Sequence, residues 1–136
     1  MLLQGKRIFV VEDDSSNLAI IRTILLRHGA SVPFEVWGHK TVDAMFRSLP
    51  IDLILLDLAL PEGVSGYDVF DQLRAIPELS QVPVVVVTAS DPSTEMLRAR
   101  ERGLNGFISK PIQYSTFAKL VAAALDGKDV WDDVPV

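Results

Sequence analysis

The residues best suited to chemistry are carboxylates, a hydroxyl and an amine, each placed at the end of a short apolar run. Glu12 and Asp13 follow one run, Asp57 follows a second, Thr88 ends a third and Lys110 comes just after a fourth. Carboxylates brought close together repel one another and raise each other's pKa unless a cation neutralises them. An oxygen-only set of ligands with room for water favours Mg²⁺ or Mn²⁺ over zinc.

An ammonium and a hydroxyl beside such carboxylates predict a site for a phosphoryl group. Lys110 would bring positive charge, and Thr88 a hydrogen-bond donor, to the phosphoryl oxygens. A carboxylate can itself be the nucleophile and form an aspartyl-phosphate. Asp57 is the candidate because it follows a wholly apolar run and precedes an irregular loop, residues 58–66. Taken singly, each residue has a plainer explanation as a cap, turn or strand residue, so the prediction rests on their coincidence.

Five short apolar runs alternate with five helical patterns, and these elements must position the polar residues. Strands are expected at residues 8–11, 30–36, 51–56, 82–87 and 106–108. Helices are expected at residues 15–28, 39–49, 67–76, 93–102 and 113–125. Strict alternation predicts right-handed crossovers and a parallel α/β sheet with helices on both faces.

The expected strand order is 2-1-3-4-5, the flavodoxin-like arrangement, and it places the polar residues together. Three of the runs are apolar at successive positions, which is typical of strands buried on both faces. The run that contains Pro33 suits an edge, because proline cannot donate to a neighbouring strand. Ligands of open α/β sheets bind at the carboxyl ends of strands, where the order reverses between the first and third strands. Since neighbouring strands lie about 4.8 Å apart, Glu12, Asp13 and Asp57 would crowd that edge.

Length and composition indicate one domain of ordinary globular character. The chain has 136 residues, for which we expect a domain over residues 1–126 and an acidic C-terminal tail over residues 127–136. The lack of cysteine excludes disulfides and thiolate chemistry and favours a reducing, cytoplasmic compartment. A net charge of −5 disfavours direct binding to nucleic acid, and no apolar run is long enough to span a membrane. We also expect Arg98, Arg100 and Arg102 to form solvated surface, because residues two apart do not share one helix face.

The chain resembles the receiver domain of two-component response regulators, over residues 6 to about 126. The motifs that carry the resemblance occur in order and at the correct spacing: Val10-Val11-Glu12-Asp13-Asp14, Asp57-Leu58-Ala59-Leu60-Pro61, Val87-Thr88-Ala89 and Phe107-Ile108-Ser109-Lys110-Pro111. The resemblance implies a phosphoacceptor switch that receives a phosphoryl group from a histidine kinase or a His phosphotransfer protein. It implies self-phosphorylation and slow self-dephosphorylation rather than turnover of a metabolite. The start at Met1 and the tail favour a stand-alone protein.

The resemblance also implies a cation site around the phosphoacceptor. Asp57 would accept the phosphoryl group. Mg²⁺ would be held by Asp13, Asp57, the backbone carbonyl of Ala59 and, through water, Glu12.

Further roles carried by the resemblance concern the phosphoryl group and the switch. Lys110 would bind the phosphoryl group, Thr88 would move inward to donate to it, and Phe107 would change rotamer to follow. The peptide bond before Pro111 would be cis. Ala59 and Ser90 would tune dephosphorylation, and an effector protein would bind the side of the sheet that runs from Ser93 to Leu125.

Two departures and two alternatives accompany this interpretation. The loop from Pro61 to Gly66 is one residue longer than the commonest receiver form, and residues 103–106 lack the paired acids of receivers that dimerise to activate DNA-binding domains. We therefore do not expect that dimer. One alternative is a receiver-like module that only binds partners. The other is an aspartyl-phosphate phosphatase of the haloacid-dehalogenase type, which needs Asp-x-Asp after the first strand, whereas Asp57 follows the third and has Ala59 two positions on.

Overall fold

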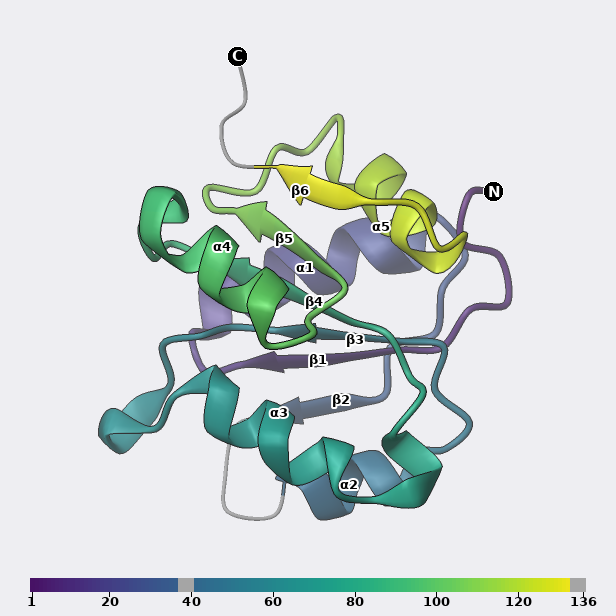
Figure 1. The fold of residues 1–136 in the computed structure, drawn as a ribbon. Coiled ribbons are helices and arrows are strands. Elements are labelled where there is room, and N and C mark those ends of the chain that lie inside the picture. The colour runs from purple at the N-terminus through teal and green to yellow at the C-terminus, as the bar shows by residue number, and fades with distance from the viewer. Residues whose placement is uncertain (37–40, 133–136) are drawn as a thin grey trace.

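The computed structural model describes residues 1–36 and 41–132, in which strands and helices alternate around one sheet (Figure 1). The strands are β1 (Ile8–Glu12), β2 (Phe34–Val36), β3 (Leu53–Leu56), β4 (Val84–Thr88), β5 (Gly106–Ser109) and β6 (Val130–Asp132). The helices are α1 (Ser15–Arg27), α2 (Thr41–Arg47), α3 (Gly66–Arg74), α4 (Pro92–Glu101) and α5 (Phe117–Leu125), with 3₁₀ turns at Pro61–Gly63 and Pro77–Leu79. The predicted α/β class is confirmed.

The sheet runs in the order β2-β1-β3-β4-β5-β6, and every neighbouring pair is parallel. The first five strands follow the predicted order, with β2 at one edge. Every residue of β1, β3 and β4 is buried, which agrees with the apolar runs that make up β3 and that precede Glu12 in β1 and Thr88 in β4. The carboxyl ends of these strands therefore meet along one edge of the sheet.

A sixth strand corrects the sequence analysis. We expected an acidic C-terminal tail over residues 127–136, whereas β6 pairs with β5 over three residues. Gly127 turns the chain after α5 with a φ of +79°, and Val130 is then buried beside β5. The strand β5, the helix α5 and the strand β6 make one more βαβ unit with parallel strands. The acidic residues masked the signal, which was the pair of β-forming residues Val130 and Trp131. Residues 133–136 lie outside the described part.

The helices form two layers. Figure 1 shows α1 and α5 on one face of the sheet and α2, α3 and α4 on the other. The first layer packs through residues such as Ile21, Leu25 and Phe117, and the second through Val69 and Phe70. Burial of one such side chain contributes about 1.5–3 kcal/mol, so both faces hold the sheet in place. Within residues 1–36 and 41–132, no helix is long and apolar enough to cross a bilayer.

Local polar signals explain where the helices begin. Asp14 caps α1 by accepting hydrogen bonds from the backbone amides of Ser16 and Asn17, at 2.9 and 3.0 Å. Ser65 and Asp68 form a capping box at the start of α3. Helix α5 begins four residues later than expected, after a turn that includes the bond from the Thr116 amide to the Gln113 carbonyl. The expected start of the second helix at residue 39, and Trp37, lie outside the described residues.

Arg98, Arg100 and Arg102 are exposed, as the sequence analysis expected, and they also lie over aromatic rings. Arg98 and Arg102 are four residues apart and share one face, where both lie over the ring of Tyr67 in α3, at 5.1 and 4.6 Å from its centroid. Arg100 points elsewhere and lies 4.4 Å from the ring centroid of Trp131. Stacking on aromatic rings therefore gives each arginine a packing role as well as a charge.

Candidate functional site

The three predicted carboxylates meet at the carboxyl edge of the sheet. Glu12 ends β1, and Asp57 follows β3, where its amide donates to the Val11 carbonyl at 3.1 Å and so extends the ladder between the two strands. Glu12, Asp13 and Asp57 each offer a carboxylate oxygen, and these oxygens lie within 4.8 Å of one another. Glu12 and Asp57 are buried, and Asp13 is exposed. The structure thus brings together the acids that the sequence placed at one edge.

Lys110 lies among these carboxylates. Its Nζ donates to Glu12 Oε1 at 2.6 Å and to Asp57 Oδ2 at 2.9 Å. The Lys110 side chain is 10% exposed, so these pairs are shielded from water. The Lys110–Pro111 peptide bond is cis, as the resemblance implies.

The ion pairs and burial shift two pKa values. Burial raises the pKa of Glu12 above its ordinary value, and this effect outweighs the hydrogen bond from Lys110 that favours the carboxylate. Burial disfavours the charged form of Lys110, but its hydrogen bonds to Glu12 and Asp57 prevail and raise its pKa. Lys110 therefore stays an ammonium at neutral pH and keeps a positive charge beside Asp57.

Thr88 and Phe107 lie on the neighbouring strands β4 and β5, and both are fully buried. Thr88 Oγ1 donates to Ser90 Oγ at 3.2 Å, and the Ser90 amide donates back to Thr88 Oγ1 at 3.3 Å. In the β4–β5 register, Thr88 is paired with Ser109, the residue before Lys110. The Thr88 hydroxyl thus lies at the edge of the sheet that carries the acids, but it is hydrogen-bonded to Ser90.

The loop after Asp57 is folded back on itself. The Ala59 amide donates to Asp57 Oδ1 at 3.1 Å, Ala59 forms an antiparallel bridge with Ser65, and the Gly66 amide donates to the Leu58 carbonyl at 2.8 Å. At the loop's tip Glu62 adopts a left-handed φ of 62° within the 3₁₀ turn. These contacts fix the position of the exposed Ala59 relative to the Asp57 carboxylate.

Gly66 is a positioning residue that the sequence analysis did not single out. A Cβ on Gly66 would lie 2.3 Å from the Asp57 carbonyl oxygen and 2.9 Å from the Leu58 Cα. Only glycine therefore lets α3 start directly against the backbone of Asp57. In the sequence this glycine looks like any loop residue, because the requirement comes from a contact across the fold.

The donor set fits a divalent cation. If all three acids are ionised, they and Lys110 carry a formal charge of −2, which a single divalent cation balances. Carboxylate and carbonyl oxygens are the ligands that Mg²⁺ prefers. An aspartate flanked by a fixed ammonium and a cation site can act as a nucleophile toward a phosphoryl group. The fold and the site together define a parallel α/β module with three carboxylates and a lysine at the carboxyl edge of its sheet.

Comparison with known proteins places the module in a family. Residues 8–122 match the response regulator receiver domain, and the chain belongs to that family. It is 30% identical over 121 residues to protein PilH of Pseudomonas aeruginosa, covering 89% of this chain and 98% of PilH. It is 33% identical over 120 residues to the polar-differentiation response regulator DivK of Brucella ovis, covering 88% of this chain and 96% of DivK.

Solved structures agree with this assignment. The non-phosphorylated HemR receiver domain of Leptospira biflexa superposes with a TM-score of 0.76 at 26% identity, covering 89% of this chain and 94% of HemR. The receiver domain of a sensor histidine kinase from Pseudomonas aeruginosa, with a magnesium ion coordinated in its active-site cleft, gives 0.77 at 25% identity, with 90% and 98% covered. The protein is therefore a phosphoacceptor signalling switch of two-component systems.

Proposed function

We propose that Asp57 is the phosphoacceptor and that it takes its phosphoryl group from a phosphohistidine of a histidine kinase or a His phosphotransfer protein. The observation that carries this proposal is the 2.9 Å pair between Lys110 Nζ and Asp57 Oδ2 beside the acidic cluster. A nucleophilic carboxylate with a shielded ammonium at its side is arranged to receive a negatively charged group.

The transfer needs no other nucleophile. An Asp57 carboxylate oxygen attacks the phosphorus, an O–P bond forms and the P–N bond of the phosphohistidine breaks. The histidine nitrogen leaves with the bonding pair and is protonated. Lys110 then holds a phosphoryl oxygen in place of the carboxylate oxygen that it binds in this structure. Hydrolysis by water later breaks the new O–P bond, releases inorganic phosphate and restores the Asp57 carboxylate.

Glu12, Asp13 and Asp57, with the backbone carbonyl of Ala59, are the residues that would hold Mg²⁺. When bound, the cation supplies charge stabilisation for the transferring phosphoryl group. Mn²⁺ prefers the same oxygen ligands and would serve as well. Asp13 is exposed and can reach a hydrated cation directly. The Glu12 carboxylate is already bound by Lys110, so it would contact the cation through a water molecule.

The switch would be carried by Thr88 and Phe107. Thr88 would exchange its hydrogen bond with Ser90 for one to the phosphoryl group, and Phe107 would move into the space that Thr88 leaves. Thr88 ends β4 and Phe107 lies in β5. Both are next to the surface formed by α4, β5 and α5, which spans Ser93 to Leu125 and which we call the output face. A downstream effector protein would recognise this face in one state of the switch.

The protein would catalyse only its own phosphorylation and slow dephosphorylation, with Ala59 and Ser90 as the positions that set the second rate. It would act in the cytoplasm, without direct contact to nucleic acid or membrane.

A mass measurement tests the assignment of Asp57. Incubation with acetyl phosphate and Mg²⁺ is expected to add one phosphoryl group to the wild type and none to Asp57→Ala. Asp52→Ala serves as the control, because Asp52 is an exposed acid that caps the Arg7 amide away from the cluster. An undiminished adduct on Asp57→Ala would move the phosphoacceptor elsewhere. No adduct on the wild type would favour a module that only binds partners.

A further inference from the structure

The strand β6 lies along the middle of the output face. It pairs with the edge of β5, and Figure 1 shows it between α4 and α5. Its first residue, Val130, is buried with the residues of α5, and its second, Trp131, packs with those of the α4 side. An edge strand offers unpaired backbone groups to any partner that adds a strand. In this protein the chain's own C-terminal segment takes up that edge.

The fit between β5 and β6 is close at its start. A Cβ on Gly106 would lie 2.8 Å from the Val130 carbonyl oxygen, so a side chain at position 106 is excluded by β6 itself. The approach to β6 is set by the turn after α5, where the amides of Gly127 and Lys128 donate to the Ala124 and Ala123 carbonyls at 3.0 Å. The first residues of β6 are therefore firmly packed in the fold.

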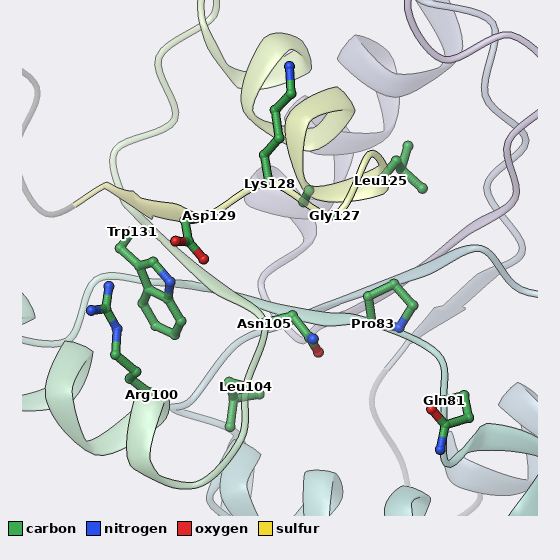
Figure 2. A pocket seen from close by; sticks show the side chains of 11 residues that line it. Gln81, Pro83, Arg100, Leu104, Asn105, Leu125, Gly127, Lys128, Asp129 and Trp131 are labelled. Carbon is green, nitrogen blue, oxygen red and sulfur yellow. The ribbon is translucent and has the colours of Figure 1, made fainter.

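Trp131 attaches β6 to α4. Figure 2 shows its indole directed from β6 toward α4, with the Arg100 side chain alongside, and the guanidinium lies 4.4 Å from the ring centroid. The ring is partly buried against the core that includes Phe107 and Leu104. A cation over an aromatic face adds a specific attraction to this packing. Trp131 thus packs β6 against α4, one of the two helices of the output face.

The same tryptophan is next to the switch. In the β5–β6 register Trp131 is paired with Phe107, and in the β4–β5 register Phe107 is paired with Val86, two residues before Thr88. Phe107 is fully buried, so a change in its rotamer must displace neighbouring groups. Trp131 is one of those neighbours. The position of Thr88 on β4 and the packing of β6 are therefore connected through Phe107 and Trp131.

The packing of β6 also leaves it displaceable. The strand has only three residues, and a cavity of about 500 Å³ lies between the α4–β5 turn and the α5–β6 turn. Its lining includes Arg100, Leu104, Leu125, Lys128 and Trp131, as Figure 2 shows. Short edge segments with incomplete packing open at a fraction of the global free energy of unfolding.

We infer that β6 is an autoinhibitory cover of the output face, seated more firmly when Asp57 is unphosphorylated and loosened by phosphorylation. The partner that then binds is one that presents an extended segment to the β5 edge with an apolar or aromatic side chain in the place of Trp131. This inference rests on the proposed function, because it concerns the regulation of the same switch. A purely structural β6 would be seated equally in both states.

Hydrogen exchange on the full chain tests the cover. Beryllofluoride with Mg²⁺ serves as the stable phosphoryl mimic, and exchange is followed in the segment that contains Val130 and Trp131. We expect exchange there to become at least fivefold faster with beryllofluoride, while β1 and β3 stay protected. Unchanged or slower exchange in β6 would overturn the inference.

Reciprocity gives a second, independent measurement. If β6 is seated more firmly in the unphosphorylated state, removal of its anchor must favour the other state by the same coupling. Trp131→Ala is therefore expected to bind beryllofluoride about fivefold more tightly than the wild type, which is about 1 kcal/mol of coupling. Phe46→Ala, which truncates an exposed aromatic on α2, is the matched control and is expected to bind as the wild type does. Equal affinities for all three chains would overturn the inference and leave the proposed function standing. Absence of beryllofluoride binding in all three would overturn both.

Discussion

Lys110 Nζ lies 2.9 Å from Asp57 Oδ2, although 53 residues separate them along the chain. The pair exists because β3 and β5 end at the same edge of the sheet, with β4 between them. Lys110 also donates to Glu12, so one ammonium is shared by two buried carboxylates. The site thus holds charge that the sheet geometry, rather than any local sequence, brings together.

Lys110→Gln tests how far this ammonium supports the fold. Removal of one member of a buried ion pair leaves uncompensated charge and typically costs about 3–5 kcal/mol. We expect a loss in that range at pH 8 without metal, measured by urea unfolding. Mg²⁺ should restore more stability to this variant than to the wild type, because it replaces the missing positive charge. Lys119→Gln, an exposed lysine of α5, is expected to leave the free energy of unfolding unchanged; equal losses in the two variants would refute a special role for Lys110.

Asp13→Ala separates cation binding from folding. Asp13 is the exposed acid of the cluster, so its loss removes a ligand and some repulsion without opening the core. We expect Mg²⁺ binding, which is in the millimolar range for such open oxygen sites, to disappear together with phosphorylation, while thermal stability is kept or slightly raised. Asp43→Ala removes an exposed acid of α2 as a charge-matched control. Phosphorylation of Asp13→Ala at the wild-type rate would show that the cation site is wrongly placed.

Gly66→Ala tests the contact between α3 and the phosphoacceptor. The added Cβ would meet the Asp57 carbonyl oxygen at 2.3 Å, so the backbone of Asp57 must move. Misplacement of a reacting group by about 1 Å can cost 100-fold in rate, and we expect phosphorylation by acetyl phosphate to fall at least tenfold. Gly63→Ala is the control: its φ of +72° makes alanine strained, but no atom lies near its Cβ position. A wild-type rate of phosphorylation in Gly66→Ala, as in Gly63→Ala, would show that the contact at Gly66 does not position Asp57.

The sequence was sufficient for the fold and for most of the site because both follow from general rules. Apolar runs at successive positions indicate buried parallel strands, and polar residues at their ends must then share an edge. That reasoning brings Glu12, Asp13 and Asp57 together without knowledge of any distance. Asp14, the next acid in the sequence, instead caps α1 through its two amide contacts.

What the sequence could not supply depends on contacts between distant segments. Gly66 is special only because the backbone of Asp57 lies against it, and β6 forms only because Gly106 leaves room for Val130. The stacking of Arg98 and Arg102 on Tyr67 likewise requires the placement of α4 beside α3. The C-terminal segment carries three aspartates, which led to the expectation of a tail although Val130 and Trp131 are β-forming residues.

Tyr67 provides a pH test of the contact between α3 and α4. Its hydroxyl donates to Glu95 Oε1 at 2.9 Å, and burial, followed by this hydrogen bond, raises the pKa of Tyr67 to about 12. The unfolded pKa is about 10, so the folded protein holds this proton more tightly. The resulting stability is present below pH 10 and is lost as pH rises toward 12. We expect Tyr67→Phe to lose about 1 kcal/mol at pH 8 and to show a shallower decline between pH 9 and 11; parallel declines in urea unfolding would contradict the raised pKa.

The phosphoryl group on Asp57 is expected to be long-lived. Hydrolysis needs a water molecule aligned with the phosphorus opposite the Asp57 oxygen, and a polar side chain close by can orient it. Ala59 has no hydrogen-bonding side chain, and Ser90 is short and neutral, so neither residue is well suited to hold the attacking water. We therefore expect a lifetime of minutes to hours. Ala59→Asn combined with Ser90→Glu should place polar groups beside the phosphoryl group and speed decay about tenfold, which is about 1.4 kcal/mol of barrier. Phosphate release after rapid removal of the donor measures this rate. Decay of the wild type within seconds, or an unaltered rate in the double variant, would mean that other residues align the water.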